Sequence, residues 1–134
     1  NITILPAAEF RIAYFMHYEH PMLRNLTFDF QPDAESFSRQ VAPARTFALY
    51  EEVKGILEKG LAKGGSVENA VVFYEDSTSS PLRFPDEPAR HKVLDIMGDL
   101  SLLGRRLRGR IVAVRSGHAL NQSLVRKIAE EYPG

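Results

Sequence analysis

The chain has 134 residues, of which 44% are hydrophobic and 25% charged, and its formal net charge at pH 7 is zero. These values are typical of one globular domain with a sizeable core, and the lack of a basic excess argues against a nucleic-acid binder. The absence of Cys excludes disulfides and thiolate-bound zinc, and without a run of 18 apolar residues no transmembrane helix is predicted.

The first third of the chain predicts two strands followed by a short helix. Residues 10–18 are rich in β-formers, and residues 23–30 alternate apolar and polar side chains, so the two segments are expected to pair as a hairpin. Asp33 is a suitable N-cap for a helix that runs to about Val41.

His17 and His20 could form a metal-binding pair where the first strand ends. A strand residue and a turn residue need not converge, however, and no carboxylate motif joins them. We therefore favour ordinary structural roles for both histidines and keep the metal pair as the alternative.

The middle of the chain predicts a helix and a strand joined by a turn. Residues 49–59 have helical spacing, and residues 70–74 favour a strand. The segment 63–66, Lys-Gly-Gly-Ser, lacks the spacing of a phosphate-binding loop and is interpreted as a turn.

Thr46 lies in a segment, residues 42–47, that is expected to be a loop. Its hydroxyl could donate a hydrogen bond to a developing oxyanion. An ordinary turn residue is the alternative interpretation.

The stretch from His91 to Asp99 predicts the middle of an amphipathic helix, with Asp86 as its N-cap and residues 102–104 as its end. Because an α-helix turns once every ~3.6 residues, His91 and Asp95 lie one turn apart on one face, with Asp99 one turn further. An imidazole nitrogen and a carboxylate oxygen at this spacing can bind one metal ion. A polar stripe that faces water explains the same spacing.

His118 lies where a predicted strand, residues 111–114, leads toward a predicted helix at 124–129. Such junctions often hold active-site groups, although a single loop His is more often structural. The basic segment 105–110 is interpreted as a solvated turn, with attraction of an anionic partner as the alternative.

Four motifs occur in an order that resembles one protein family. They are Ala-Pro-Ala-Arg-Thr-Phe at 42–47, a Gly-rich segment at 60–72, the helix motif at 84–104 and Ser-Gly-His-Ala-Leu-Asn at 116–121. Together they resemble the second domain of the zinc-dependent UDP-3-O-acyl-N-acetylglucosamine deacetylases, which commit Gram-negative bacteria to lipid A synthesis.

The predicted elements and the resemblance imply the same fold class. We expect a two-layer α+β sandwich, a mainly antiparallel sheet with helices on one face. The resemblance implies that residues 1–134 form the C-terminal domain, with a small helix–strand insert at about 48–74 that forms an acyl-chain tunnel. Ordinary core packing of the insert is the alternative. Because the chain begins at Asn1 rather than Met, we expect a fragment, an excised domain or a processed product.

The resemblance also implies roles for the two histidine motifs. His91 and Asp95 match zinc ligands of the family. His118 matches the group that stabilises the oxyanion and protonates the leaving amine. Asp99 matches the residue that holds the His118 ring and favours its protonated form. Zinc would polarise the substrate amide and activate water.

Further matches concern the substrate, a UDP-linked acylated N-acetylglucosamine. Thr46 would donate to the oxyanion, Lys92 would lie beside the metal, Arg115 near the nucleotide diphosphate and Phe47 at the sugar. The residues that match the acyl tunnel are Tyr50, Val53, Ala62, Val67, Ala70 and Val72.

One feature of the family has no counterpart in this chain. The third zinc ligand, a His, and the general-base Glu are adjacent residues of the family's first domain, and Glu19-His20 does not fit that pattern. Catalytic zinc normally has three protein ligands. We therefore predict that the chain alone is inactive and binds zinc loosely, whereas the parent is a cytoplasmic zinc deacetylase.

Two alternatives belong to different functional classes. One is a non-catalytic module that binds acyl chains or nucleotide sugars with the same fold, and the other is a metal hydrolase completed by another chain. Exposure of the surface that normally meets the first domain would also leave an apolar patch and encourage self-association.

Overall fold

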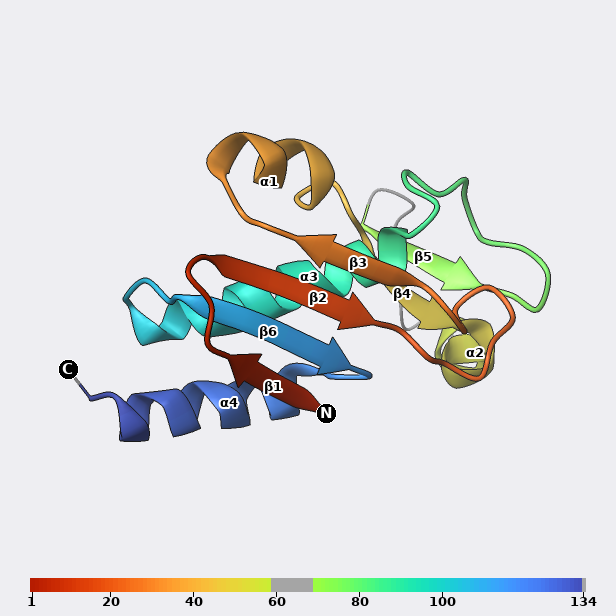
Figure 1. Cartoon of the computed structure of the whole chain (residues 1–134). Helices are drawn as coiled ribbons and strands as arrows, with labels where there is room; N and C mark the ends of the chain where they lie inside the picture. The colour runs from red at the N-terminus through yellow and green to blue at the C-terminus, as the bar shows by residue number, and fades with distance from the viewer. Residues whose placement is uncertain (59–68, 134) are drawn as a thin grey trace.

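The computed structural model describes residues 1–58 and 69–133. A four-stranded sheet forms its centre, in the order β1-β6-β2-β3 (Figure 1). The strands are β1 (Ile2–Leu5), β2 (Phe10–Phe15), β3 (Thr27–Phe30) and β6 (Gly109–Val114). β1 with β6 and β2 with β3 pair antiparallel, and β2 with β6 pairs parallel. The expected pairing of the first two predicted strands is confirmed, over shorter segments.

Two long helices form the second layer. α3 (Glu87–Leu100) packs against β2 and β3, and α4 (His118–Glu131) packs against β1 and α3 (Figure 1). Side chains from the middle of the sheet and from α3 are fully buried; they are Ile12, Tyr14, Ile111, Ala113, Val93 and Ile96. This core confirms the predicted α+β sandwich.

A second, two-stranded sheet lies beside the first. It pairs β4 (Thr46–Leu49) parallel with β5 (Ala70–Phe73), and α2 (Tyr50–Glu58) begins where β4 ends. The predicted helix and strand of this region are confirmed. The interpretation of Thr46 as a loop residue is wrong, because it pairs with Ala70 as the first residue of β4. Tunnel candidates Ala62 and Val67 and the predicted turn at 63–66 lie outside the described residues.

The helix ends test the caps that the sequence predicts. Asp33 caps α1 (Ala34–Gln40) by accepting a hydrogen bond from the Ser36 backbone N–H at 2.9 Å, as predicted. Asp86 lies before α3, but the expected side-chain cap is wrong: its Oδ1 accepts from Arg90 Nε at 2.6 Å instead. Gly104 ends this region at φ +66°, a left-handed conformation that favours glycine.

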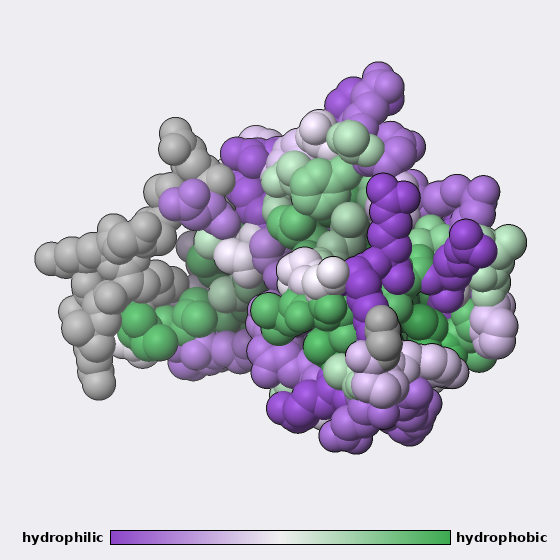
Figure 2. All heavy atoms as spheres, turned by 90° about the vertical axis from the view of Figure 1, so that its left-hand side faces the viewer, coloured by the Kyte–Doolittle hydropathy of each residue, from purple (hydrophilic) through white to green (hydrophobic). Residues whose placement is uncertain are grey.

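One end of the molecule mixes apolar and charged side chains (Figure 2). A surface pocket of about 410 Å³ is lined by Ile4, Leu5, Pro6, Arg105, Arg106, Leu107, Arg108, Ile128 and Tyr132. Among the described residues, no helix has both the length and the apolar character needed to cross a membrane.

Candidate functional site

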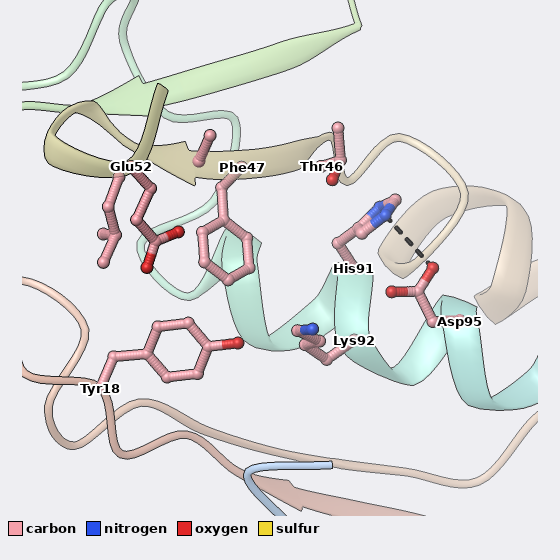
Figure 3. A pocket seen from close by; sticks show the side chains of 9 residues that line it. Tyr18, Thr46, Phe47, Glu52, His91, Lys92 and Asp95 are labelled. Atoms are coloured by element: carbon pink, nitrogen blue, oxygen red, sulfur yellow. Dashed lines mark ion pairs between the residues drawn. The ribbon is translucent and has the colours of Figure 1, made fainter. Parts of the chain in front are cut away.

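α3 presents His91, Asp95 and Asp99 at successive turns, as the sequence predicts. His91 Nε2 lies 3.3 Å from Asp95 Oδ1 (Figure 3). The Nδ1 atom of His91 lies 2.9 Å from the carbonyl oxygen of Ala44. The side chains of His91 and Asp95 are 18% and 21% exposed, so this pair is partly removed from water.

The Ala44 carbonyl determines which nitrogen of His91 carries a proton. A carbonyl oxygen only accepts, so Nδ1 donates, and in the neutral ring the lone pair lies on Nε2, facing Asp95. Burial acts to lower the pKa of His91, but hydrogen bonds to Asp95 and Ala44 outweigh it, so this pKa is raised above its ordinary value. Metal-binding histidines commonly donate their second N–H to a backbone carbonyl in this way.

His118 is the first residue of α4, and its ring lies beside two carboxylates of α3, those of Asp99 and Asp95. Its Nδ1 lies 2.8 Å from Asp99 Oδ2, and its Nε2 lies 3.8 Å from Asp95 Oδ1. The tertiary structure therefore brings the two histidine motifs together, with Asp95 in contact with both rings. The His118 side chain remains 63% exposed, so its Nε2 side is accessible.

A small pocket of about 120 Å³ borders His91 and Asp95 (Figure 3). Three further predicted site residues line it, namely Thr46, Phe47 and Lys92. Lys92 Nζ lies 5.7 Å from the centre of the Phe47 ring, within the range of a cation–π contact. The pocket therefore lies between β4 and the polar face of α3.

Sequence reasoning missed four residues that line this pocket, namely Tyr18, Ala48, Leu49 and Glu52. The Tyr18 ring lies 5.6 Å from the ring of Phe47. No local motif singles out any of the four, because they reach the pocket only through packing of the small sheet and α2 beside the main sheet.

The predicted tunnel residues within the described chain lie on α2 and β5. Ala70 and Val72 share one half-buried face of β5, while Val71 and Phe73 face the core. Tyr50 begins α2, and its ring centre lies 5.1 Å from that of Tyr74; Val53 is half-buried on the same helix. Arg115 is exposed at the turn before His118 and does not line the pocket.

His17 and His20 have separate partners. His20 Nδ1 accepts from the Met22 backbone N–H at 3.1 Å, and its Nε2 lies 2.7 Å from the carbonyl oxygen of Tyr74. His17 Nδ1 lies 3.1 Å from the carbonyl oxygen of Arg24. Both ring nitrogens of His20 are thus engaged, which supports the ordinary structural roles favoured from the sequence.

The donor atoms of His91 and Asp95 suit a shared zinc ion. Two ligand atoms about 2.0–2.1 Å from a tetrahedral ion lie about 3.3 Å apart, and His91 Nε2 and Asp95 Oδ1 are separated by 3.3 Å. Across residues 1–58 and 69–133, no group of three or more His, Cys, Asp or Glu side chains is arranged to hold a metal ion. The described part of the chain therefore brings together two candidate ligands, fewer than the three protein ligands of a catalytic zinc site.

Comparison with known proteins places the chain in one family. Residues 1–130 match the model of the family described as UDP-3-O-acyl N-acetylglycosamine deacetylase. Relatives named UDP-3-O-acyl-N-acetylglucosamine deacetylase include those of Chlamydia felis (49% identity over 97% of this chain and 48% of the relative) and Myxococcus xanthus (44% over 96% and 42%). The chain spans about half the length of these curated relatives. It belongs to the UDP-3-O-acyl N-acetylglycosamine deacetylase family.

Proposed function

We propose that this chain is the part of a zinc-dependent deacetylase that holds two zinc ligands, the general acid and the acyl-chain surface. The substrate is UDP-3-O-acyl-N-acetylglucosamine, and the reaction releases acetate in lipid A biosynthesis in the cytoplasm. The observation that carries this proposal is the cluster of His91, Asp95, Asp99 and His118 beside a pocket, in a chain that belongs to the family.

His91 and Asp95 are the residues that would hold zinc. When bound, zinc supplies a Lewis acid for the amide carbonyl and lowers the pKa of a coordinated water molecule. The Ala44 carbonyl orients the His91 ring so that Nε2 is the ligand atom. Two ligands are too few for a catalytic zinc, so we assign the third ligand and the general base to a part of the parent outside this chain.

His118 is the proton donor in this proposal. Asp99 accepts a hydrogen bond from His118 Nδ1, which leaves Nε2 as the ring atom on the side of Asp95 and the metal site. From there the doubly protonated ring can stabilise negative charge on the reacting carbonyl oxygen and deliver its Nε2 proton to the departing amine, which leaves the neutral ring with its proton on Nδ1. Thr46, at the near end of β4, contributes a second donor to that oxygen.

Other residues of this chain bind the substrate. Lys92 lies beside the metal site and Phe47 contacts the sugar, and both line the pocket. Arg115 attracts the diphosphate from the turn that precedes His118. The acyl chain is assigned to the six residues that match the acyl tunnel of the family. Of these, Tyr50, Val53, Ala70 and Val72 are half-buried, and Ala62 and Val67 lie outside the described residues.

Zinc content and acetate release in the native full-length protein test this assignment. We expect His91→Ala to lose zinc and activity, and His118→Ala to lose activity while zinc is retained. His17→Ala is the matched control, because this histidine lies outside the cluster, and it should retain both. A His91→Ala variant that keeps its zinc and its activity would remove the metal assignment.

The incomplete ligand set makes a separate prediction for the chain by itself. Residues 1–134 should bind zinc weakly in a calorimetric titration and release no acetate from the substrate. Deacetylation by this chain alone would contradict the proposal that a ligand and the general base lie elsewhere. Substrate binding without acetate release by the full-length protein would favour a binding module instead.

A further inference from the structure

Asp99 has a second partner besides His118. Its Oδ2 accepts from His118 Nδ1 at 2.8 Å and from the Asn121 side-chain Nδ2 at 3.0 Å. Asp99 and Asn121 are buried, at 8% and 2% exposure, whereas His118 is open to solvent. The exposed His118 ring therefore contacts a buried carboxylate, and that carboxylate also accepts a hydrogen bond from Asn121.

The orientation of the Asn121 amide is fixed by a third residue. Asn121 Oδ1 accepts from the Ser116 hydroxyl, so the amide must present Nδ2, and not its oxygen, to Asp99. A flipped amide would place two acceptor oxygens against each other and leave the Ser116 hydroxyl without this partner. The carbonyl oxygen of Ser116 in turn accepts from the Tyr14 hydroxyl at 3.0 Å, which ties the arrangement to the core strand β2.

The turn before α4 creates this arrangement. Arg115 has φ +54°, a conformation that is uncommon for residues other than glycine and that reverses the chain after β6. Its backbone N–H donates to the Phe15 carbonyl at 3.2 Å, which holds the turn against β2. His118 and Asn121, three residues apart in the first turn of α4, then meet Asp99 on α3 together.

We propose that Asn121 is a positioning residue for the His118 proton donor, acting through Asp99, and that the Ser116 hydroxyl holds its amide in the required orientation. This inference rests on the function proposed above. One Asp99 oxygen shared by two donors keeps the carboxylate in a single rotamer. That rotamer selects the Nδ1–H form of His118 and aims Nε2 toward the metal site. A residue that only joined α3 to α4 would have no such effect on the ring.

The first test observes the ring directly in the native full-length protein labelled with ¹⁵N at histidine. In the parent protein, the neutral form of His118 should show one tautomer with the proton on Nδ1, which is the form that remains after Nε2 has given up its proton. Asn121→Ala should give a mixture of tautomers, and Ser116→Ala should shift the ring signals in the same direction by less. Gln122→Ala is the matched control, because it is the exposed neighbour on the same helix and should leave His118 unchanged. An unaltered His118 spectrum in both the Asn121 and Ser116 variants would overturn the proposal.

The second test is a double-mutant cycle on deacetylation. Asn121→Ala should lower kcat with KM nearly unchanged, and by less than the about 10²–10⁴-fold that a general acid typically contributes, because His118 itself is retained. In an Asp99→Ala background, the same change should have almost no further effect, because its route to His118 is already gone. Fully additive losses would instead assign Asn121 a role independent of Asp99. If the parent protein shows no deacetylation, the proposed function fails, while the ring spectra still decide the positioning role.

Discussion

Glu87, at the start of α3, holds the loop that carries Ala44, whose carbonyl oxygen contacts His91. Its carboxylate accepts from the Arg45 backbone N–H at 2.8 Å, from Arg45 Nε at 2.8 Å and Nη2 at 3.0 Å, and from the Arg83 backbone N–H at 2.7 Å. The side chains of Glu87 and Arg45 are 1% and 5% exposed. Arg45 lies between Ala44, which orients His91, and Thr46. We therefore predict that Glu87→Ala both destabilises the fold and loosens the site.

The magnitude follows from burial of the pair. Removal of one member of a buried ion pair typically costs about 3–5 kcal/mol, because the other charge is left without its compensation. Glu87→Gln should also destabilise, since an NH₂ group would then face N–H donors. Glu35→Ala is the matched control: its pair with Arg39 is exposed on α1, and its loss should cost less than about 1 kcal/mol.

Urea unfolding followed by circular dichroism measures these free energies. A cost below about 1 kcal/mol for Glu87→Ala would refute the reasoning, because it would mean that the buried pair contributes no more than an exposed one. In the full-length protein, zinc affinity should fall in Glu87→Gln and remain unchanged in Glu35→Ala. Equal zinc affinity in both variants would show that the Arg45 loop does not support the site.

The same residue predicts how stability depends on pH. Burial acts to raise the pKa of Glu87, but its hydrogen bonds from Arg45 and Arg83 outweigh it, so the folded-state pKa lies below the ordinary 4.5. The stability that Glu87 contributes is therefore complete above pH 4.5 and is lost as the pH falls through the lower, folded-state value. The difference in unfolding free energy between the parent and Glu87→Gln should shrink in that acidic window. A difference that stays constant down to acid pH would contradict this linkage.

Three further predictions concern substitutions of single residues. Asp33→Ala should cost about 1 kcal/mol in urea unfolding because α1 loses its cap, and an unchanged midpoint would show that the cap contributes nothing. Gly104→Ala should lower the free energy of unfolding by about 1 kcal/mol, because the φ of Gly104 is +66°. Gly98→Ala on α3, which has open space at its Cβ position, should raise it by about 0.5–1 kcal/mol. Equal changes in the two variants would refute the conformational argument. Tyr14→Phe should cost about 1 kcal/mol through its lost bond to the Ser116 carbonyl. Burial raises the pKa of Tyr14, so this phenol should not ionise near pH 10 in the folded protein. The absorbance titration of Tyr14→Phe near pH 10 should therefore match that of the parent protein.

The sequence by itself determined the local features of this protein. Helical spacing places His91, Asp95 and Asp99 on one face of α3, and the structure confirms that arrangement. The cap at Asp33 and the paired strands β2 and β3 were equally predictable. Each depends on residues close together in the chain, whose relative positions follow from backbone geometry. The cap predicted at Asp86 is not formed, because its carboxylate accepts a hydrogen bond from Arg90 instead. A suitable residue type at the cap position therefore does not by itself decide the hydrogen-bond partner.

Only the tertiary structure decided how these features combine. Thr46 was expected in a loop because β4 has no strong signal of its own; it becomes a strand by pairing with β5, whose first residue, Ala70, lies 24 positions further along the chain. The contact between Asp99 and His118, which the family resemblance implied but spacing alone could not give, joins elements that are distant in sequence. The hydrogen bond between His91 and the Ala44 carbonyl, which nothing in the sequence predicted, does the same. Spacing within one helix has a fixed geometry, whereas the distance between two elements depends on how their apolar faces pack against the sheet.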